Sequence, residues 1–210
     1  HTDDVFHERL YAIQWMTKES LSKGRQETYF AAVTAEDLER ERRVEEYLRD
    51  NIQTWQEEGY IPDMEIESRF ETTRLRRERG WTHWHHLFAP RQLLFCGLVG
   101  KKSKTSPVAK VFLARMLDWN SKLCRYGTGA ARESIAQTFY NQAFNTFFNY
   151  GVRSFGFSAN YLKEIPAPAP VHCETYRVVN APAADLEQSA EYWITDPPYA
   201  DAVNYHEITE

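Results

Sequence analysis

Cysteine is scarce in this sequence of 210 residues, which contains only Cys96, Cys124 and Cys173. The three lie far apart, none belongs to a Cys-x-x-Cys pair, and their number is odd. These features argue against a disulfide framework and against a zinc ribbon within this stretch, so we predict no metal site. The simplest interpretation is a protein of the reducing cytoplasm.

Long hydrophobic runs are also missing. No segment approaches the roughly 18 consecutive apolar residues of a membrane span, and the mean hydropathy is −0.62. No charged-then-apolar leader follows His1, so we expect no membrane partner. Apolar residues nevertheless make up 42% of the chain and aromatic residues 14%, which favours a packed core over disorder. The length corresponds to one domain, or to one and a fraction.

Charge is distributed unevenly along the chain. Residues 69–132 contain 14 basic and three acidic side chains, a net charge of +11, whereas the flanking regions are acidic. A basic middle between acidic flanks is typical of a region that meets phosphates. The alternative is that helices simply carry solvated lysine and arginine.

The first third of the chain predicts a β-hairpin followed by a long helix. Residues 10–15 and 28–33 are rich in aromatic and β-branched types, and a polar turn separates them. Thr34 is a good N-cap with Asp37 in the capping-box position, and Gly59 ends the helix.

The middle of the chain predicts an irregular stretch and then three helices. Residues 59–90 show no regular period, and one helix begins at Pro90. A second has Ser106 as its cap and extends towards Leu123. A third occupies residues 134–150, where apolar pairs recur every four residues.

After a proline-rich break at residues 158–170, the sequence pattern changes from helical to strand and loop. Residues 175–179 and 191–195 predict two strands, and the second leads directly into an Asp-Pro-Pro-Tyr sequence. Strand, loop and helix in succession are typical of an α/β sheet. The fold class expected is therefore mixed α/β, with a largely helical part before the sheet.

Asp196, Pro197, Pro198 and Tyr199 form the sharpest chemical signal in the sequence. The exocyclic nitrogen of adenine is a poor nucleophile, so an enzyme that methylates it must hold its N–H groups with acceptors. The Asp196 carboxylate and the Pro197 carbonyl can accept those hydrogen bonds, the two prolines fix the backbone, and Tyr199 can stack on a flipped base. The alternative is a Pro-Pro turn capped by an aspartate.

Asp-Pro-Pro-Tyr is also the catalytic motif of DNA amino-methyltransferases that use S-adenosylmethionine, and the wider sequence resembles one group of them. That group is the large adenine-specific DNA methylases described as containing a zinc ribbon, some of which lie near anti-phage defence genes. The resemblance covers most of residues 9–210. It rests on residues 59–64 (Gly-Tyr-Ile-Pro-Asp-Met), 80–94 (Gly-Trp-Thr-His-Trp-His-His-Leu-Phe-x-Pro-Arg-Gln-Leu-Leu), 120–126 (Asn-Ser-Lys-Leu-Cys-Arg-Tyr) and 195–205 (Thr-Asp-Pro-Pro-Tyr-Ala-Asp-x-Val-x-Tyr).

The resemblance implies a fragment of an enzyme that transfers a methyl group from S-adenosylmethionine to adenine N6 in double-stranded DNA. Residues 1–157 would then be a largely helical insertion for target recognition, and residues 171–210 the C-terminal part of a Rossmann-like methyltransferase sheet. The catalytic residues implied are Asp196, Pro197, Pro198 and Tyr199. The remainder of the methyltransferase and other phage-defence proteins are the expected protein partners.

The sequence departs from this family in its cofactor motif. The family places a Gly-rich donor-binding motif upstream of this region, and neither that motif nor the zinc-ribbon cysteines occur here. Gly127 and Gly129 follow a predicted helix rather than a strand and are a poor substitute. Asp185 is the candidate contact for the adenine of the donor. We therefore expect these 210 residues to be inactive alone.

Two further clusters have competing interpretations. His83, His85 and His86 resemble a metal site, but no carboxylate or cysteine lies at a usual ligand spacing, so packing or capping is favoured. The basic middle supplies ten candidates for phosphate contacts. These are Arg74, Arg76, Arg77, Arg79, Arg91, Lys101, Lys102, Lys104, Lys122 and Arg125.

Two other functions are compatible with the sequence. The same geometry could methylate cytosine N4 or a base in RNA. A chain without the donor motif could also be a non-catalytic DNA-binding or assembly module of a defence complex.

Overall fold

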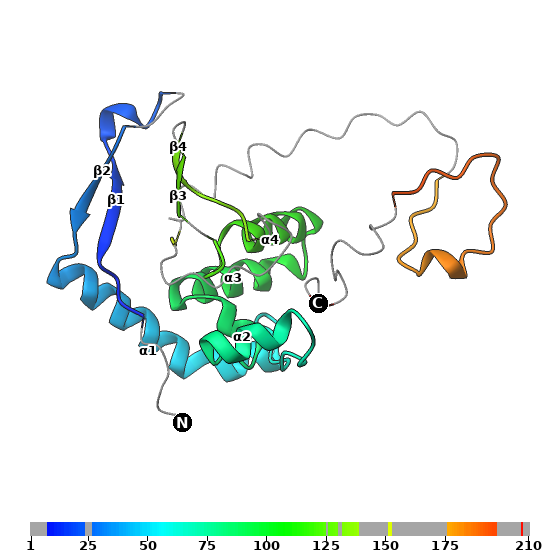
Figure 1. The fold of residues 1–210 in the computed structure, drawn as a ribbon, viewed down its shortest axis with the longest axis horizontal. Helices are drawn as coiled ribbons and strands as arrows, with labels where there is room; N and C mark the ends of the chain where they lie inside the picture. Colours follow the sequence, from blue (N-terminus) through cyan, green and yellow to red (C-terminus); the bar gives the residue numbers. More distant parts are fainter. Residues whose placement is uncertain are drawn as a thin grey trace.

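The computed structural model describes residues 8–23, 27–124, 126–129, 132–138, 151–152, 176–196 and 207. Its regular elements are helices together with two separate two-stranded antiparallel sheets, so the fold is mixed α and β as expected. The helices gather in one part of the molecule, and both hairpins lie beside them (Figure 1).

The helical unit contains α1 (Ala35–Glu57), α2 (Thr72–Arg79), α3 (Pro90–Ser103) and α4 (Pro107–Trp119). The start of α1 confirms the predicted capping box. Thr34 Oγ1 accepts a hydrogen bond from the Asp37 amide at 3.2 Å, and the Asp37 carboxylate accepts one from the Thr34 amide at 3.0 Å. Ser106 caps α4 in the same way, with 3.3 Å between its Oγ and the Ala109 nitrogen. Local sequence therefore fixes where both helices begin.

The predicted N-terminal hairpin is also confirmed. Strand β1 (Ala12–Met16) pairs antiparallel with β2 (Thr28–Ala32), and Trp15 lies opposite Tyr29. Phe30 of this hairpin makes an edge-on contact with Tyr126, with 6.0 Å between ring centroids. The contact joins it to the second hairpin, formed by β3 (Tyr126–Gly129) and β4 (Arg132–Ile135).

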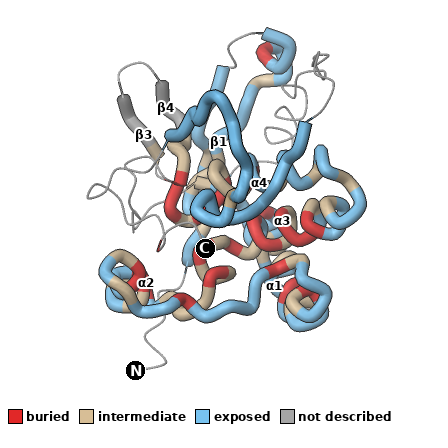
Figure 2. Tube along the Cα trace, turned by 90° about the vertical axis from the view of Figure 1, so that its right-hand side faces the viewer, coloured by how far each residue is buried: buried red, intermediate tan, exposed pale blue. Residues whose placement is uncertain are grey.

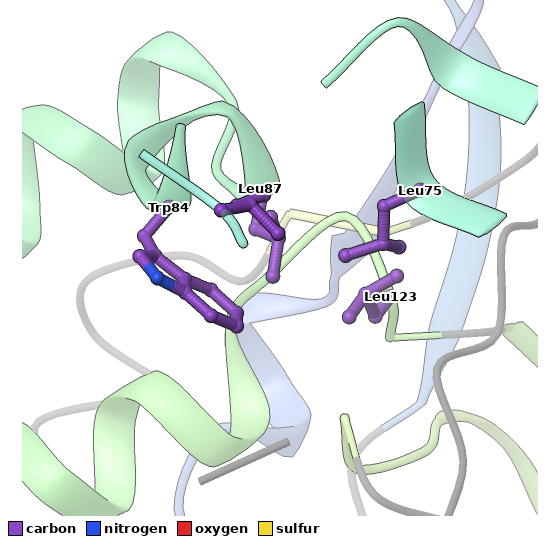
Figure 3. Close-up of a cluster of buried hydrophobic side chains, with 5 residues drawn as sticks. Leu75, Trp84, Leu87 and Leu123 are labelled. Carbon is purple, nitrogen blue, oxygen red and sulfur yellow. The ribbon is translucent and has the colours of Figure 1, made fainter. Parts of the chain in front are cut away.

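One buried cluster lies beneath α2. Sequence periodicity did not predict this helix. Its members are Ile66, Leu75, Trp84, Leu87 and Leu123, shown in Figure 3. Helix α2 is rich in arginine and contributes Leu75 as its one large apolar residue, fully buried in this cluster. A helix with a single apolar anchor has no apolar stripe from which its period could be recognised.

A second buried cluster joins α1 to α3 and contains Leu48, Trp55, Ile61 and Leu93. The two helices approach closely because Gly97 faces the Trp55 ring, and a Cβ at that position would overlap the ring. Figure 2 shows buried residues along α3, whereas α1 is buried at only a few positions and exposes most of its length. Among the described residues, no helix combines the length and the apolar character that crossing a membrane requires.

Several predicted elements are wrong in extent or type. Helix α4 ends at Trp119, whereas the sequence predicted that it continues past Leu123 and stops near Gly127. Ser134 and Ile135, predicted to begin a helix, belong to β4, and residues 139–150 lie outside the described residues. The proline-rich break at 158–170 also lies outside them.

The strands predicted at 175–179 and 191–195 do not form within residues 176–196, where the regular element is the short 3-10 helix Ala183–Asp185. This segment lies apart from the helices (orange and red in Figure 1). Its large apolar side chains are exposed, up to 97% for Ile194. A strand is stable only beside a neighbour that accepts and donates its backbone hydrogen bonds, and no described strand lies beside this segment.

Candidate functional site

Asp196 is the last residue described in the segment 176–196, and it is exposed. The backbone before it has no regular secondary structure, in place of the sheet strand that the motif leads one to expect. Pro197, Pro198 and Tyr199 lie outside the described residues. The carboxylate of Asp196 is thus accessible to a substrate.

Asp185, the candidate donor contact, is the last residue of the 3-10 helix Ala183–Asp185. Its amide donates to the Pro182 carbonyl at 3.0 Å, and its side chain is exposed. An open surface depression lies elsewhere, lined by residues 65–68 and Arg76, so it includes neither Asp185 nor Asp196. The structure does not bring the two aspartates into a common pocket within the described residues.

The arginines of α2 are engaged with carboxylates or buried. Arg74 pairs with Glu78 at 2.9 Å, and Arg77 reaches the same carboxylate at 3.5 Å. Arg76 pairs with Glu65. Arg79 is buried, and loss of hydration lowers its pKa from the usual arginine value. Nearby glutamates in the folded chain therefore neutralise part of the positive charge counted along residues 69–132.

Two more of the basic candidates have partners far away in the sequence. Arg91 pairs with Glu41 of α1. Lys122 pairs with Glu8, and its ammonium lies 5.4 Å from the centre of the Trp81 ring. Only 11% of the Lys122 side chain is exposed, which leaves little of it for a phosphate. Arg125 lies outside the described residues.

The remaining lysines form an exposed corner where α3 ends and α4 begins, which we call the lysine corner: Lys101, Lys102, Lys104 and Lys110. Lys104 donates to the Glu58 carbonyl and lies 4.4 Å from the centre of the Tyr60 ring, which fixes its position. No carboxylate of the described residues pairs with Lys101, Lys102 or Lys110. Lys110 was not among the phosphate candidates predicted from the sequence. Its position one turn into a helix, next to a lysine-rich turn, could have indicated it.

Two of the segments that carry the family resemblance meet in the interior. Gln92 Nε2 donates to Asn120 Oδ1 at 3.1 Å, and both side chains are buried. The Lys122 amide donates to the Leu87 carbonyl at 2.7 Å. Residues 80–94 and 120–124 therefore contribute to the core and its polar contacts.

The three histidines form a packed cluster at the 3-10 helix Trp84–Leu87. The rings of His85 and His86 lie 4.5 Å apart between centroids, and His83 lies 5.4 Å from His86. His86 Nδ1 accepts from the Thr82 amide at 3.1 Å and from the His83 amide at 3.4 Å, so its proton resides on Nε2. Within the described residues no three His, Cys, Asp or Glu side chains are placed to hold a metal ion. The three histidines therefore cap the 3-10 helix and pack against one another, which is the interpretation that the sequence favoured.

Burial, together with the charges of His85, His83 and Lys122, lowers the pKa of the His86 ring to about 4 and so keeps the ring neutral near pH 7. Burial also lowers the pKa of His85, again helped by His83 and Lys122, while a hydrogen bond with Pro62 and the charge of Asp63 act in the opposite direction. Both rings therefore accept a proton less readily in the folded chain than in the unfolded one.

We expect this cluster to make stability depend on pH. Because the folded His86 has the lower pKa, its contribution is complete above about pH 6.5 and is lost as pH falls towards 4. The loss should be about 1–2 kcal/mol, since the ring is only partly buried and water screens its charge. His86→Asn keeps an acceptor near the Nδ1 position without titrating. Urea unfolding between pH 7 and 4.5 should show a shallower decline in the variant, and parallel curves would contradict the assignment.

The cysteines offer no reactive nucleophile among the described residues. Burial raises the pKa of the Cys96 thiol to about 12. Cys124 is fully buried and contacts Thr138 Oγ1 at 3.4 Å and Ser121 Oγ at 3.7 Å. These contacts join the end of α4 to the residues that follow β4.

Comparison with known proteins adds no further identification. No family model matches this chain, and neither the curated proteins nor the solved structures yielded a match.

Proposed function

We propose that this chain is part of a DNA methyltransferase that modifies adenine at N6. The observation that carries the proposal is the sequence Asp196, Pro197, Pro198 and Tyr199, with the Asp196 carboxylate exposed to solvent. The resemblance of residues 9–210 to the large adenine-specific DNA methylases supports the same activity.

Asp196 is the acceptor that orients the amino group of the target base. Its carboxylate takes a hydrogen bond from one N–H, and the carbonyl of Pro197 takes the other, so that the nitrogen lone pair turns out of the ring plane. Tyr199 provides the stacking surface for a base that has left the duplex. The base must leave the duplex because one of its two amino N–H groups is otherwise paired with thymine, so the loop could not hold both of them.

The described residues do not fit S-adenosylmethionine. A donor site of this class needs a Gly-rich turn after a strand, but Gly127 and Gly129 lie within β3, which is paired to β4. We therefore derive no step through the donor and assign its binding to residues beyond this set, with Asp185 as one candidate contact.

The remainder of the catalytic domain is the partner that this proposal requires. Within residues 176–196, Tyr176, Val178, Tyr192 and Ile194 are each more than four-fifths exposed. Large apolar side chains this exposed within one short segment support an interaction with another part of the protein. The strands predicted at 175–179 and 191–195 would form when the neighbouring strands of a Rossmann-like sheet are supplied.

The lysine corner is the proposed contact for the DNA backbone, and it favours a DNA-binding module as the second candidate function. Exposed lysines without carboxylate partners attract phosphates and release counterions on binding. Lys101→Glu with Lys102→Glu should weaken binding to a DNA duplex by about 10- to 100-fold and should reduce its salt dependence. Gel shifts or fluorescence anisotropy at several salt concentrations would measure both effects.

Lys18→Glu is the matched control for the single variant Lys101→Glu, because each reverses one exposed charge and Lys18 lies in the β1–β2 hairpin, away from the lysine corner. It should leave the affinity nearly unchanged. Equal weakening by both reversals would indicate that net charge alone drives the association.

The substrate is tested by identifying the methylated nucleoside. Complete natural protein, labelled S-adenosylmethionine and either duplex DNA or RNA are incubated, and the nucleic acid is digested to nucleosides. Label in N6-methyladenine from DNA supports the proposal. Label in N4-methylcytosine or in an RNA nucleoside would assign the alternative substrate, and DNA binding without any transfer would favour the non-catalytic module.

A further inference from the structure

Helix α2 begins without a local partner for its first amides. Its N-cap residue, Glu71, has helical backbone angles and makes no side-chain capping bond, and the first turn contains no acidic residue. The Thr72 hydroxyl points toward the residues before the helix. It accepts a hydrogen bond from the Arg69 amide at 2.9 Å and donates one to the Glu67 carbonyl. The amides of Glu71 and Thr72 therefore need an acceptor from elsewhere.

Glu207 supplies that acceptor from 135 positions further along the chain. Its Oε2 accepts a hydrogen bond from the Glu71 amide at 2.7 Å and is 3.4 Å from the Thr72 amide. Only 5% of Glu207 and 2% of Thr72 are exposed, so the contact is enclosed. A carboxylate is stable in such a position only where N–H donors and a positive potential compensate its lost hydration.

Helix α2 provides that potential. Its N-terminus carries the positive end of the helix dipole. The nearby arginines add little to this potential, because Arg69, Arg74, Arg76 and Arg77 each pair with a glutamate. The two amides and the helix dipole are therefore what compensates the Glu207 carboxylate.

We propose that Glu207 is a positioning residue, which fastens the chain that follows the Asp196 motif onto the N-terminus of α2. Asp196 precedes Glu207 by only 11 residues, so the contact limits how far the motif can lie from the arginine helix. The fastening itself involves neither DNA nor a methyl donor. Its consequence, a restricted position for the catalytic motif, rests on the function proposed above.

Amide hydrogen exchange resolved at single residues tests the contact directly. In Glu207→Ala the amides of Glu71 and Thr72 should exchange about tenfold faster, because they lose their acceptor. The amides of Thr73 and Arg74 are internal controls, since they donate to the carbonyls of Arg69 and Glu71 at 3.0 and 3.2 Å. Their protection should change much less, and α1 and α3 should be unaffected.

Two further variants complete the test. Glu207→Gln keeps the oxygen acceptor without the charge and should give an intermediate increase at Glu71 and Thr72 even if the alanine variant folds poorly. Glu187→Gln removes an exposed charge from the same C-terminal part and should leave exchange unchanged. Unchanged protection at Glu71 and Thr72 in both Glu207 variants would overturn the proposal, as would a loss spread evenly over α1 and α3. Because no DNA or methyl donor is present, neither result depends on the proposed activity.

Discussion

Replacing Asp196 by alanine is expected to lower the rate of methyl transfer to DNA by about 10²- to 10³-fold while leaving DNA affinity unchanged. In the proposed mechanism the carboxylate orients the target amino group, and removal of one such orienting hydrogen bond costs a factor of this size. Asp196 is exposed, so its replacement by alanine should leave the fold unaffected. Transfer rates and DNA affinity are measured on the complete natural protein.

Two companion variants sharpen this prediction. Asp196→Asn retains one acceptor oxygen but introduces an N–H₂ group that opposes the N–H of the base, so it should also be strongly impaired. Glu191→Ala removes an exposed carboxylate five residues earlier and should transfer at the normal rate. A normal rate in Asp196→Ala would end the mechanistic claim, even if the protein were a methyltransferase.

Replacing Leu123 by alanine is expected to lower the free energy of unfolding by about 3–5 kcal/mol. Leu123 is fully buried in the cluster with Ile66, Leu75, Trp84 and Leu87 (Figure 3). Truncation of such a side chain removes its hydrophobic contribution and leaves a cavity that the rigid surroundings fill only in part. Urea unfolding followed by tryptophan fluorescence measures the change.

Leu98→Ala is the matched control for this core prediction. Leu98 lies on α3 and is 49% exposed, so the same truncation should cost less than about 1 kcal/mol. Similar losses in the two variants would mean that Leu123 does not occupy the centre of a packed cluster.

Sequence predicted best the elements whose signals are local. The capping box of Thr34 and Asp37, the Ser106 cap and Pro90 at the start of α3 each act within one helical turn, and all three helices begin where expected. The first hairpin was equally readable from two short β-prone segments around a polar turn. Local hydrogen bonds and backbone preferences decide these features without help from the rest of the fold.

Features that depend on distant partners could not be predicted in the same way. The net charge of residues 69–132 gave no sign that Glu65 and Glu41 neutralise Arg76 and Arg91. Nothing in the sequence connected Glu207 with α2. Residues 191–195 have the composition of a strand, but composition supplies no neighbouring strand, and the segment remains unpaired.

The candidate site likewise combines features that local sequence predicts with features that depend on distant partners. The acceptors Asp196 and Pro197 were identified from residue chemistry, and the phosphate candidates from charge alone. Of those candidates, the structure leaves Lys101 and Lys102 exposed without a carboxylate partner among the described residues, and it buries most of Lys122. Charge pattern thus located the basic region but did not separate surface contacts from internal ion pairs.

The most direct test of the central claim is transfer of a labelled methyl group from S-adenosylmethionine to duplex DNA by the complete natural protein, with Asp196→Ala measured in parallel. We predict label in N6-methyladenine from the unaltered protein and a loss of about 10²- to 10³-fold in the variant. No label in any nucleoside from the unaltered protein, with duplex DNA bound, would contradict the assignment of this chain to an adenine methyltransferase.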